Sequence, residues 1–362
     1  MTQQATERDA PYPELKKKHT AARVGTPWSD HKPPASAPVW GVIQGYGNYW
    51  LLVSAVQLGV FDALQRLQPC RLGVICCELD VPERTGLFLM DGLVAIGMIE
   101  QYRNEYRLGD LAARYLTTDG PASMADLIAV APGPLENWTD LANTFRHGTP
   151  STPIENDAPA FYLPLVEATF PTIFRAATRA DLKIGYSRRR GTRLLDLGAG
   201  CGPWTAAVLS KDPEATSTVN DLPGVIGAAE RTLRRLGVAD RVTWLPGDFH
   251  EVAIESGAYD MVVLGHVIRT EGADGARHLI SRAFDALKPE GRVVVADYFR
   301  DNTRKFNPFG VLMGVTMVAA TRRGGTFTNG EVSEWIRDAG FHAIRLVEPI
   351  GFNQMYVAEK SG

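Results

Sequence analysis

The feature that most constrains this chain is a short apolar run that leads directly into three closely spaced glycines. Leu194–Leu197 has the composition of a buried strand. Gly198, Gly200 and Gly202 follow, and Pro203, which has no N–H to lose and a preset φ, suits the first turn of a helix. Glycines let the backbone approach a ligand closely, and the free N–H groups at a helix start favour an anionic or strongly polar group. The segment therefore predicts a strand, a loop and a helix that hold a nucleotide-like cofactor.

The spacing of the glycines argues against a dinucleotide cofactor. The dinucleotide fingerprint is Gly-x-Gly-x-x-Gly, with a glycine at the sixth position. Here the third glycine, Gly202, comes one residue early, and Pro203 stands where that glycine should be. We therefore expect a nucleotide-like cofactor other than NAD.

Two further segments end in side chains that suit an adenosine. Asp221 lies roughly 20 residues after the glycines, at the end of a second expected strand, where a carboxylate can accept hydrogen bonds from both ribose hydroxyls. A third segment, Arg241–Phe249, ends in Asp248 and Phe249, which suit an adenine amino group and an adenine face. Three strand ends are thus expected to converge on one adenosine.

The order of these three motifs resembles that of the S-adenosylmethionine (SAM)-dependent methyltransferases. More narrowly, the chain from about Trp40 to its C-terminus is similar to the plant caffeate and bacterial small-molecule O-methyltransferases. The resemblance implies an α/β fold, with a Rossmann-like methyltransferase domain preceded by a mainly α-helical, winged-helix-like dimerisation domain. It also implies SAM as the cofactor, with Asp196, Leu222 and Gly265 joining the binding residues named above. Glycines at a single turn often serve packing alone, but the three motifs together favour the cofactor.

Composition and charge exclude several classes of protein. The chain has 362 residues, of which 45% are hydrophobic, so it can bury a large core and is expected to hold two domains. Its formal net charge of −3 argues against a general binder of nucleic acid or of anionic membranes. No apolar run reaches membrane-spanning length, and no apolar signal core is present. The four cysteines show no metal-site spacing, so we expect reduced thiols in a cytoplasmic protein.

The chain divides by composition into three parts. Residues 1–38 are polar and proline-rich, which predicts a flexible or strap-like extension. Residues 39–150 are the expected helical dimerisation domain, and residues 151–362 the expected SAM-binding domain. Within the first of these, Tyr49–Phe61 is apolar nearly all round. This predicts a helix that is buried against a second copy of the chain, and hence a homodimer.

A winged-helix outline after this helix raises the alternative of a DNA-binding regulator. Leu72–Leu79 and Glu83–Gly97 are expected helices, and a small β-wing follows. The would-be recognition helix from Glu83 is mostly apolar with one arginine, whereas DNA recognition needs several exposed cations there. We therefore expect no nucleic-acid partner. The family resemblance assigns this module to dimerisation and substrate enclosure.

Apolar and aromatic residues favour a small aromatic acceptor. Residues 297–325 form an insertion rich in adaptable apolar side chains, which suit an aromatic ligand, although at helical spacing such residues are more often core. The segments around Trp138 and Tyr162 match family regions that lead into the substrate cavity or contact cofactor and substrate. The expected pocket residues are Trp138, Tyr162, Phe309, Met313 and Met317.

Methyl transfer requires an acceptor that is held close to the methyl group and is unprotonated when it attacks. A phenol of pKa about 10 costs roughly 4 kcal/mol to ionise at pH 7, and a positioned base recovers about 10²–10⁴ of rate. In the resembled O-methyltransferases the base is a histidine followed by Asp-Trp, just after the fourth strand. That histidine aligns with Arg269 here, and the Asp-Trp pair is absent. Of two flanking acids in the plant enzymes, one is kept as Asp297 and the other is replaced by Thr326.

His266, Arg269 and Asp297 are therefore the candidate catalytic residues. His266, three residues before Arg269, could substitute as the base or could only pack beside the cofactor. Arg269 could fix a substrate carboxylate, stabilise a phenolate, or form a surface ion pair.

The missing base leaves the reaction itself open. O-methylation of a phenolic secondary-metabolite precursor is favoured by the family, and C-methylation of an aromatic ring or of a keto or amino acid is the alternative. Iron-holding keto-acid relatives carry a second histidine in the insertion, which Leu312–Thr321 lacks, so we expect no metal. Two further alternatives are a different reaction with bound SAM and a ligand-sensing dimer.

Overall fold

The computed structural model describes residues 35–130, 136–303, 308–350 and 353–362. Nearly all of the expected N-terminal extension, residues 1–38, lies outside these ranges. The contacts divide the chain into two compact units, with the division between Ala113 and Arg114. The domain limits expected from the sequence stay a prediction.

The first unit opens with two helices where one was expected. Helix α1 spans Ala37–Gln57 and α2 spans Val60–Leu67. The prediction of one continuous helix over Tyr49–Phe61 is therefore wrong. Gly59 adopts φ +72°, a left-handed conformation that interrupts the helix and begins the next one.

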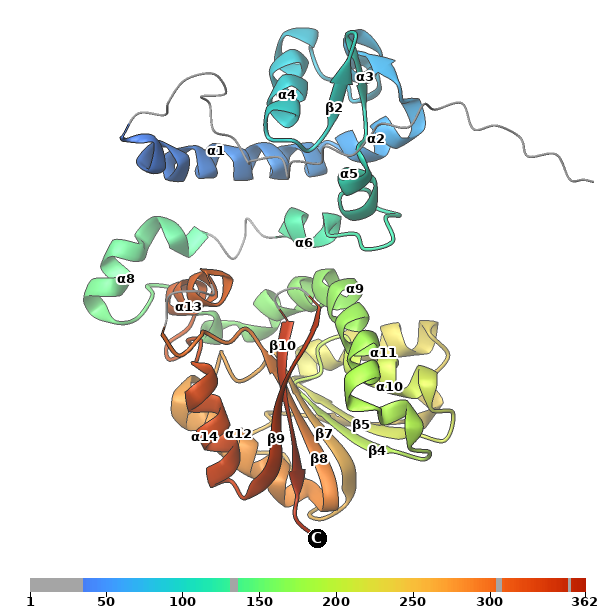
Figure 1. Ribbon diagram of the computed structural model, residues 1–362, viewed down its shortest axis with the longest axis vertical. Coiled ribbons are helices and arrows are strands. Elements are labelled where there is room, and N and C mark those ends of the chain that lie inside the picture. The colour runs from blue at the N-terminus through green and yellow to red at the C-terminus, as the bar shows by residue number, and fades with distance from the viewer. Residues whose placement is uncertain (1–34, 131–135, 304–307, 351–352) are drawn as a thin grey trace, which may run out of the picture. The chain divides into compact units, whose positions relative to one another are not determined.

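The expected helix, helix and wing follow in the first unit (Figure 1). The helices are α3 (Leu72–Glu78) and α4 (Glu83–Ala95). Strands β1 (Cys70–Arg71), β2 (Glu100–Tyr102) and β3 (Glu105–Arg107) form an antiparallel sheet in the order β1-β3-β2. Helix α4 exposes the apolar side chains Leu87 and Phe88, which fits the expectation that it is no DNA-recognition helix. Helix α5 (Asp110–Tyr115) runs across the division between the units.

The second unit is built on a seven-stranded sheet in the order β6-β5-β4-β7-β8-β10-β9. The first five strands in this order are parallel, and β10 is antiparallel to both of its neighbours. This confirms the α/β Rossmann-like fold class, with a mixed sheet. The strands are β4 (Arg193–Leu197), β5 (Thr216–Asp221), β6 (Val242–Pro246), β7 (Tyr259–Gly265), β8 (Leu287–Asp297), β9 (Phe341–Ile350) and β10 (Asn353–Lys360).

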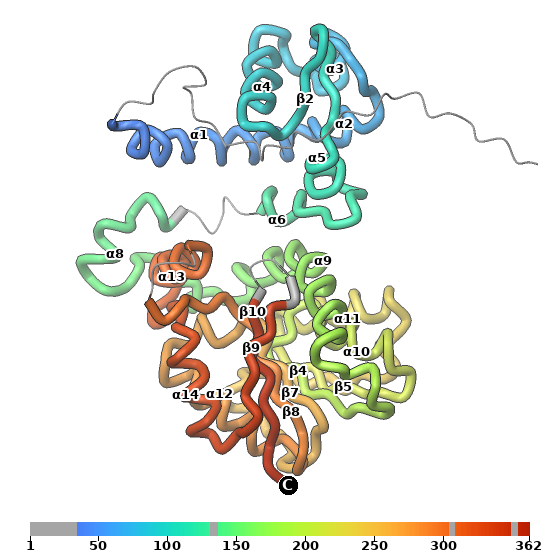
Figure 2. The backbone as a smooth tube through the Cα atoms, in the orientation of Figure 1, coloured from blue at the N-terminus to red at the C-terminus, as the bar shows by residue number. Residues whose placement is uncertain are grey.

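Helices cover both faces of this sheet (Figures 1 and 2). One face carries α9 (Ala158–Ile184), α10 (Pro203–Lys211) and α11 (Pro223–Arg235), and the other carries α12 (Gly272–Ala286) and α14 (Asn329–Asp338). The remaining helices of the unit are α6 (Ala125–Val130), η1 (Glu136–Asp140), α8 (Leu141–His147), η2 (Ile154–Asn156), η3 (Tyr186–Arg188), η4 (Ala239–Arg241) and α13 (Pro308–Ala320). Among the helices of the described ranges, none combines the length and apolar character that crossing a bilayer requires.

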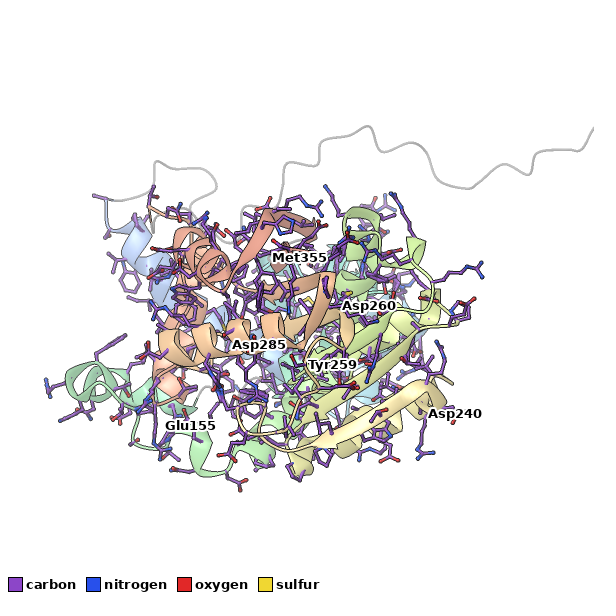
Figure 3. All side chains as sticks on the ribbon, turned by 90° about the horizontal axis from the view of Figure 1, so that it is seen from below. Glu155, Asp240, Tyr259, Asp260, Asp285 and Met355 are labelled. Carbon is purple, nitrogen blue, oxygen red and sulfur yellow. The ribbon has the colours of Figure 1, made fainter. Side chains whose placement is uncertain are left out.

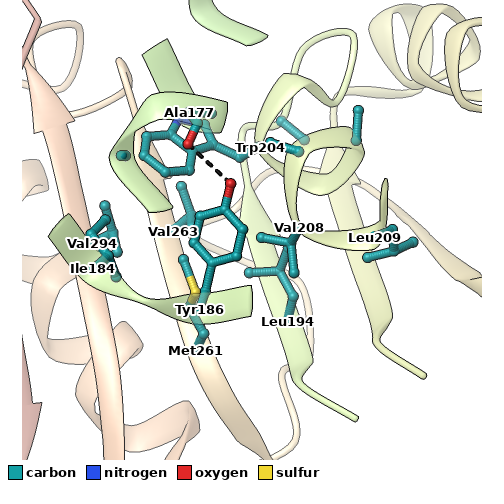
Figure 4. Close-up of a cluster of buried hydrophobic side chains, with 14 of the residues drawn as sticks. Ala177, Ile184, Tyr186, Leu194, Trp204, Val208, Leu209, Met261, Val263 and Val294 are labelled. Atoms are coloured by element: carbon teal, nitrogen blue, oxygen red, sulfur yellow. Dashed lines mark hydrogen bonds between the residues drawn. The ribbon is translucent and has the colours of Figure 1, made fainter. Parts of the chain in front are cut away.

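Two apolar cores separate along alternate residues of the strands. Leu194 packs into the core under α9 and α10, and Leu195 packs into the core under α12 and α14. In the first core the Tyr186 hydroxyl donates to the Ala177 carbonyl oxygen at 3.0 Å (Figure 4). Because both faces of the sheet are buried, Leu194, Leu195 and Leu197 of β4 are all apolar although their side chains alternate between the two faces.

Strand β8 begins with an irregular segment at the amino-terminal edge of the sheet. The sequence Lys288–Gly291 is typical of a turn, but β8 already begins at Leu287. Leu287 pairs with Tyr259 and Arg292 with Met261, so the intervening residues bulge out of the ladder. Beside them, Asp260 (Figure 3) accepts a hydrogen bond from Lys288 Nζ at 2.9 Å.

Strand β4 marks the point where the strand order reverses. Its neighbours are β5 on one side and β7 on the other, and the chain runs outward in both directions from it. In open α/β sheets, ligands bind at the carboxyl ends of the strands beside such a point. The loops after β4, β5, β6, β7 and β8 meet at this edge.

Candidate functional site

The loop after β4 has a backbone that requires glycine. Gly198, Gly200 and Gly202 have φ values of +65°, +57° and +71°. A Cβ atom at Gly198 would lie 2.5 Å from Val267 Cγ1, and one at Gly200 would lie 2.9 Å from Val166 Cγ1. The loop is therefore restricted to glycine both by conformation and by space.

Asp221 ends β5 and bonds directly to this loop. Its Oδ2 accepts the Gly200 N–H at 2.6 Å, and its Oδ1 accepts the Leu222 N–H at 2.7 Å. Burial raises the pKa of Asp221, while the two backbone hydrogen bonds act in the opposite direction. Each carboxylate oxygen can accept a second hydrogen bond, which is what a ribose diol would need.

Asp196 has partners within the chain. It is buried inside β4, and its Oδ2 accepts the Thr205 N–H at 3.1 Å and the Thr205 hydroxyl at 2.8 Å. Burial raises its pKa to about 6, against the effect of the two bonds from Thr205. Thr205 lies in the first turn of α10, where the helix dipole favours a negative charge. Asp196 thus holds α10 beneath the glycine loop, and direct contact with a cofactor stays a prediction.

The loop after β6 brings Asp248 and Phe249 to the same edge. Phe249 Cε1 lies 3.3 Å from the Cβ position of Gly198, so its ring borders the glycine loop. Asp248 is exposed, and its Oδ1 accepts the His250 N–H at 2.7 Å. Asn220 positions this loop, because its Nδ2 donates to the carbonyl oxygens of Leu245 (2.8 Å) and Gly247 (2.9 Å). Sequence reasoning missed Asn220, because most residues of β5 are polar and nothing in the sequence distinguishes Asn220 from them.

Gly265 ends β7 against α10. A Cβ atom there would lie 2.9 Å from Trp204 Cδ1, so the indole occupies the space that a side chain would fill. The residues around the ends of β4, β5 and β6 fit SAM: a close backbone approach, a buried carboxylate with free lone pairs and an aromatic ring come together there.

His266 follows β7 in a constrained position. Its φ is +65°, and its side chain is 7% exposed. Its Nδ1 lies 3.8 Å from Asp297 Oδ1, beyond hydrogen-bond distance, and its ring centroid lies 4.9 Å from that of Tyr298. Burial lowers the pKa of His266 and Asp297 only partly offsets this, so the imidazole is neutral at pH 7.

Arg269 forms a buried ion pair with Asp297. Its Nη1 donates to Asp297 Oδ1 at 3.0 Å and to the His266 carbonyl oxygen at 2.5 Å, and its backbone N–H donates to Asp297 Oδ2 at 3.2 Å. Burial would raise the pKa of Asp297, but the Arg269 guanidinium holds it below its usual range. The expected alternative of a surface ion pair is wrong, because the two side chains are only 15% and 2% exposed.

Comparison with known proteins identifies the domain that carries this site. Residues 182–342, which include all the loops described above, match the family of the O-methyltransferase domain. This part of the chain is an O-methyltransferase domain, and the protein is a SAM-dependent methyltransferase. The methyltransferase acts on small molecules, with SAM as its cofactor.

Individual relatives agree with this assignment. A 3-hydroxy-5-methyl-1-naphthoate 3-O-methyltransferase of Streptomyces sahachiroi is 25% identical over 311 residues, which cover 82% of this chain and 86% of that protein. An L-tyrosine C(3)-methyltransferase of Streptomyces lavendulae is 22% identical over 315 residues, or 83% of this chain and 85% of that protein. The crystal structure of human N-acetylserotonin methyltransferase in complex with SAM superposes with a TM-score of 0.78 at 21% identity, covering 92% of this chain and 99% of that one.

The structure brings some of the expected pocket residues close to Arg269 and Tyr298. The ring of Phe309, on α13, lies 4.9 Å from that of Tyr298. Burial raises the pKa of Tyr162, on α9, to about 12, against the effect of the nearby Arg269 guanidinium. Met313 is half-buried and Met317 is buried, both on α13. Thr326, which replaces the second family acid, donates its hydroxyl to the Gly310 carbonyl oxygen at 2.8 Å.

Trp138 lies on η1, which packs against α13. Among the described residues its Nε1 has no hydrogen-bond partner. Within the same ranges, no three His, Cys, Asp or Glu side chains gather as a metal ion would require. The roles of all these pocket residues stay predictions.

Two contacts at this edge had no signal in the sequence. His250 Nε2 lies 2.9 Å from Glu271 Oε2, which ties the loop after β6 to the loop after β7. The Gly325 N–H donates to the Arg269 carbonyl oxygen at 2.8 Å, which anchors the end of the insertion. Tyr298 was also missed, since an aromatic residue after a strand is common.

Replacing Gly198 by alanine is expected to reduce the affinity for S-adenosylhomocysteine (SAH) at least about tenfold. The left-handed backbone costs about 1–3 kcal/mol for a residue with a Cβ, and the contact with Val267 adds to this. Gly191→Ala is the matched control, because Gly191 has φ +72° with nothing within 4 Å of its Cβ position. Calorimetric titration with SAH measures both variants. Equal losses in the two would show that the contact with Val267 has no effect.

Proposed function

We propose that this methyltransferase transfers the methyl group of SAM to the hydroxyl of a small aromatic acceptor. The observation that carries the proposal is the cluster at the carboxyl ends of β7 and β8. There Tyr298 lies between Phe309 and His266, with ring centroids 4.9 Å from each, and the Arg269 guanidinium carbon lies 5.5 Å from the Tyr298 centroid. Aromatic faces beside one fixed cation suit a planar ring that carries an oxygen.

The cofactor and the chain have separate tasks in this reaction. When bound, SAM supplies a methyl group on a positively charged sulfur. Arg269 stabilises negative charge on the acceptor oxygen, and Asp297 orients Arg269 through its two hydrogen bonds. Tyr298 and Phe309 bind the acceptor ring, and the apolar side chains of α13 exclude water.

One relative supports methyl transfer to oxygen, and another supports methyl transfer to carbon as the second candidate. The printed name of the naphthoate enzyme places its methyl group on a ring hydroxyl, as the proposal requires here. The name of the tyrosine enzyme places it on a ring carbon. Because an ionised phenol also carries negative charge on its adjacent ring carbons, an arginine in place of the family histidine suits C-methylation as well.

Incubation with methyl-labelled SAM and a panel of phenols, hydroxy-aromatic acids and aromatic amino acids tests the proposal. We expect the label in an aromatic product, with a proton resonance of a methoxy group. A methyl group attached to ring carbon would favour the second candidate. No label in any organic acceptor would contradict both.

We also propose that the methyltransferase is a homodimer that associates through α1. Between Val39 and Trp50 this helix exposes large apolar side chains, which a monomer would leave in water: Val39, Trp40, Val42, Ile43, Tyr46 and Trp50. A contiguous apolar surface of this kind marks a protein interface.

Sedimentation equilibrium at micromolar concentration is expected to give a dimer. The double variant Trp40→Glu/Ile43→Glu should shift the protein to monomer, because each substitution places a charge in the apolar interface. Leu236→Glu is the matched control, since Leu236 is a similarly exposed apolar residue of the second unit. A monomeric wild-type protein would refute the dimer.

A further inference from the structure

We propose that the acceptor is bound as an anion, in a receptor formed by the Arg269 guanidinium and the ring of Tyr298. The substrate class is then a small aromatic or enolic molecule whose hydroxyl is ionised near neutral pH. Phenols with electron-withdrawing substituents, hydroxyquinones and enols of β-dicarbonyl compounds belong to this class. The inference rests on the proposed function and specifies its substrate.

The Arg269 guanidinium is held by hydrogen bonds at Nη1, whereas its Nε lacks a hydrogen-bond partner among the described residues. Its Nη1 is held by the His266 carbonyl oxygen and by Asp297 Oδ1, at 2.5 and 3.0 Å. Among the described residues, its Nε is buried without a hydrogen-bond partner. A buried donor without a partner is unfavourable, because it has lost its hydrogen bonds to water. An oxygen anion of the acceptor would satisfy this donor.

Tyr298 supplies the flat side of the receptor. Its ring lies against the guanidinium, with 5.5 Å between the guanidinium carbon and the ring centroid, and it contacts His266 and Phe309 on its other sides. Burial raises the pKa of Tyr298, so the ring stays neutral and does not compete with an anion for Arg269. A planar acceptor can stack in this aromatic environment while its oxygen reaches the cation.

Within the described part of the chain, the groups that face Arg269 include no base suited to deprotonating an ordinary phenol at pH 7. On β8, Asp297 is committed to Arg269, and its pKa is held low. In the loop after β7, the pKa of His266 is lowered by burial, and both oxygens of Glu271 are already hydrogen-bonded. On α9, Tyr162 is neutral, since its pKa is raised to about 12. The arginine itself cannot accept a proton.

This arrangement favours an acceptor that has already lost its proton. An unactivated phenol, with a pKa of about 10, would need about 4 kcal/mol for ionisation at pH 7. An adjacent cation lowers the pKa of a bound hydroxyl because it favours the charged form. Methyl transfer from an anion of this class leaves no proton to remove, which explains how the site can lack the family histidine.

Spectrophotometric titration of para-nitrophenol, bound to the full-length protein saturated with SAH, tests the receptor directly. The ionised dye absorbs visible light, so its protonation is read without turnover. We expect the apparent pKa of the bound dye to lie about one unit or more below that of the free dye. A bound dye that titrates at or above the free value, or no binding of the anion, would overturn the proposal.

Two variants and one control make the assignment specific. Arg269→Lys keeps a charge opposite Asp297 but loses the planar fork, and Tyr298→Leu removes the stacking face; both should reduce the shift of the dye pKa. Arg292→Gln removes a cation in the middle of β8, five residues before Asp297, where it is bonded to Glu359, and it should leave the shift as in the wild type. An undiminished shift in folded Arg269→Lys and Tyr298→Leu would also overturn the proposal.

Rates of methyl transfer to different acceptors distinguish a failure of this inference from a failure of the proposed function. If unsubstituted phenols are methylated as fast as nitrophenols, with a rate governed by a group that titrates near pH 7, the proposed function stands and the anion receptor is wrong. If the dye pKa is lowered but no hydroxyl acceptor is methylated, the receptor stands and the proposed reaction is wrong.

Discussion

Asp221→Asn is expected to weaken the binding of SAH by about 100-fold. Both oxygens of Asp221 accept backbone N–H groups, at 2.6 and 2.7 Å, so the amide of an asparagine would point an NH₂ group at one of these donors. The charge that favours two ribose hydroxyls is lost at the same time. Hydrogen bonds to a charged group contribute about 1.5–3 kcal/mol, and about 2.8 kcal/mol corresponds to 100-fold.

Isothermal titration with SAH measures this loss, and a urea unfolding curve confirms that the variant is folded. Glu230→Gln is the matched control, because it removes a carboxylate from α11, the helix that follows the same strand, where Glu230 pairs only with Arg234 on the surface. SAH affinity near the wild-type value in Asp221→Asn would show that the ribose is bound elsewhere.

Arg269→Met is expected to lower the free energy of unfolding by about 3–5 kcal/mol at pH 7. Asp297 is 1% exposed, and without the guanidinium its charge would be buried and unpaired. Urea unfolding monitored by tryptophan fluorescence measures the change. In the double variant Arg269→Met/Asp297→Asn much of the loss should be recovered, because no uncompensated charge remains.

The pH dependence of this variant has a definite sign. In the wild type the pKa of Asp297 is held below its ordinary value of 3.8, so the pair stabilises the fold above about pH 4 and is lost only as the pH falls through that low pKa. In Arg269→Met, burial instead raises the pKa of Asp297 above its unfolded value. Relative to the wild type, the variant should therefore become more stable as the pH falls from 7 towards 5, because the other titrating groups are common to both proteins. A parallel decline of both proteins would contradict the assignment.

Local sequence patterns were sufficient for the cofactor half of the site. The glycines after Leu197, the carboxylate of Asp221 and the aromatic ring of Phe249 each follow a strand directly. In a parallel sheet, residues that follow strands gather at one edge, so their positions along the chain already predicted their proximity. Asp196 shows the limit of this reasoning, because it belongs to the same motif but its carboxylate bonds to Thr205 inside the domain.

Other features depended on backbone details that composition does not reveal. The apolar run Tyr49–Phe61 is interrupted at Gly59, since a glycine inside a helical pattern can either continue the helix or adopt positive φ. Lys288–Gly291 reads as a turn, but the pairing of β8 with β7 extends to Leu287 and makes it a bulge.

The sequence by itself determined the fold class, the glycine loop and the presence of Arg269 where the resembled O-methyltransferases carry a histidine, because strand periodicity, glycine spacing and residue identity are local properties. Only the tertiary structure decided what surrounds Arg269. Arg269 and Asp297 are 28 positions apart, and their ion pair exists because β7 and β8 are neighbours in the sheet. The same packing buries His266 and places Tyr298 on the guanidinium. Burial and charge pairing set the protonation of a side chain, and both arise only when distant segments pack together.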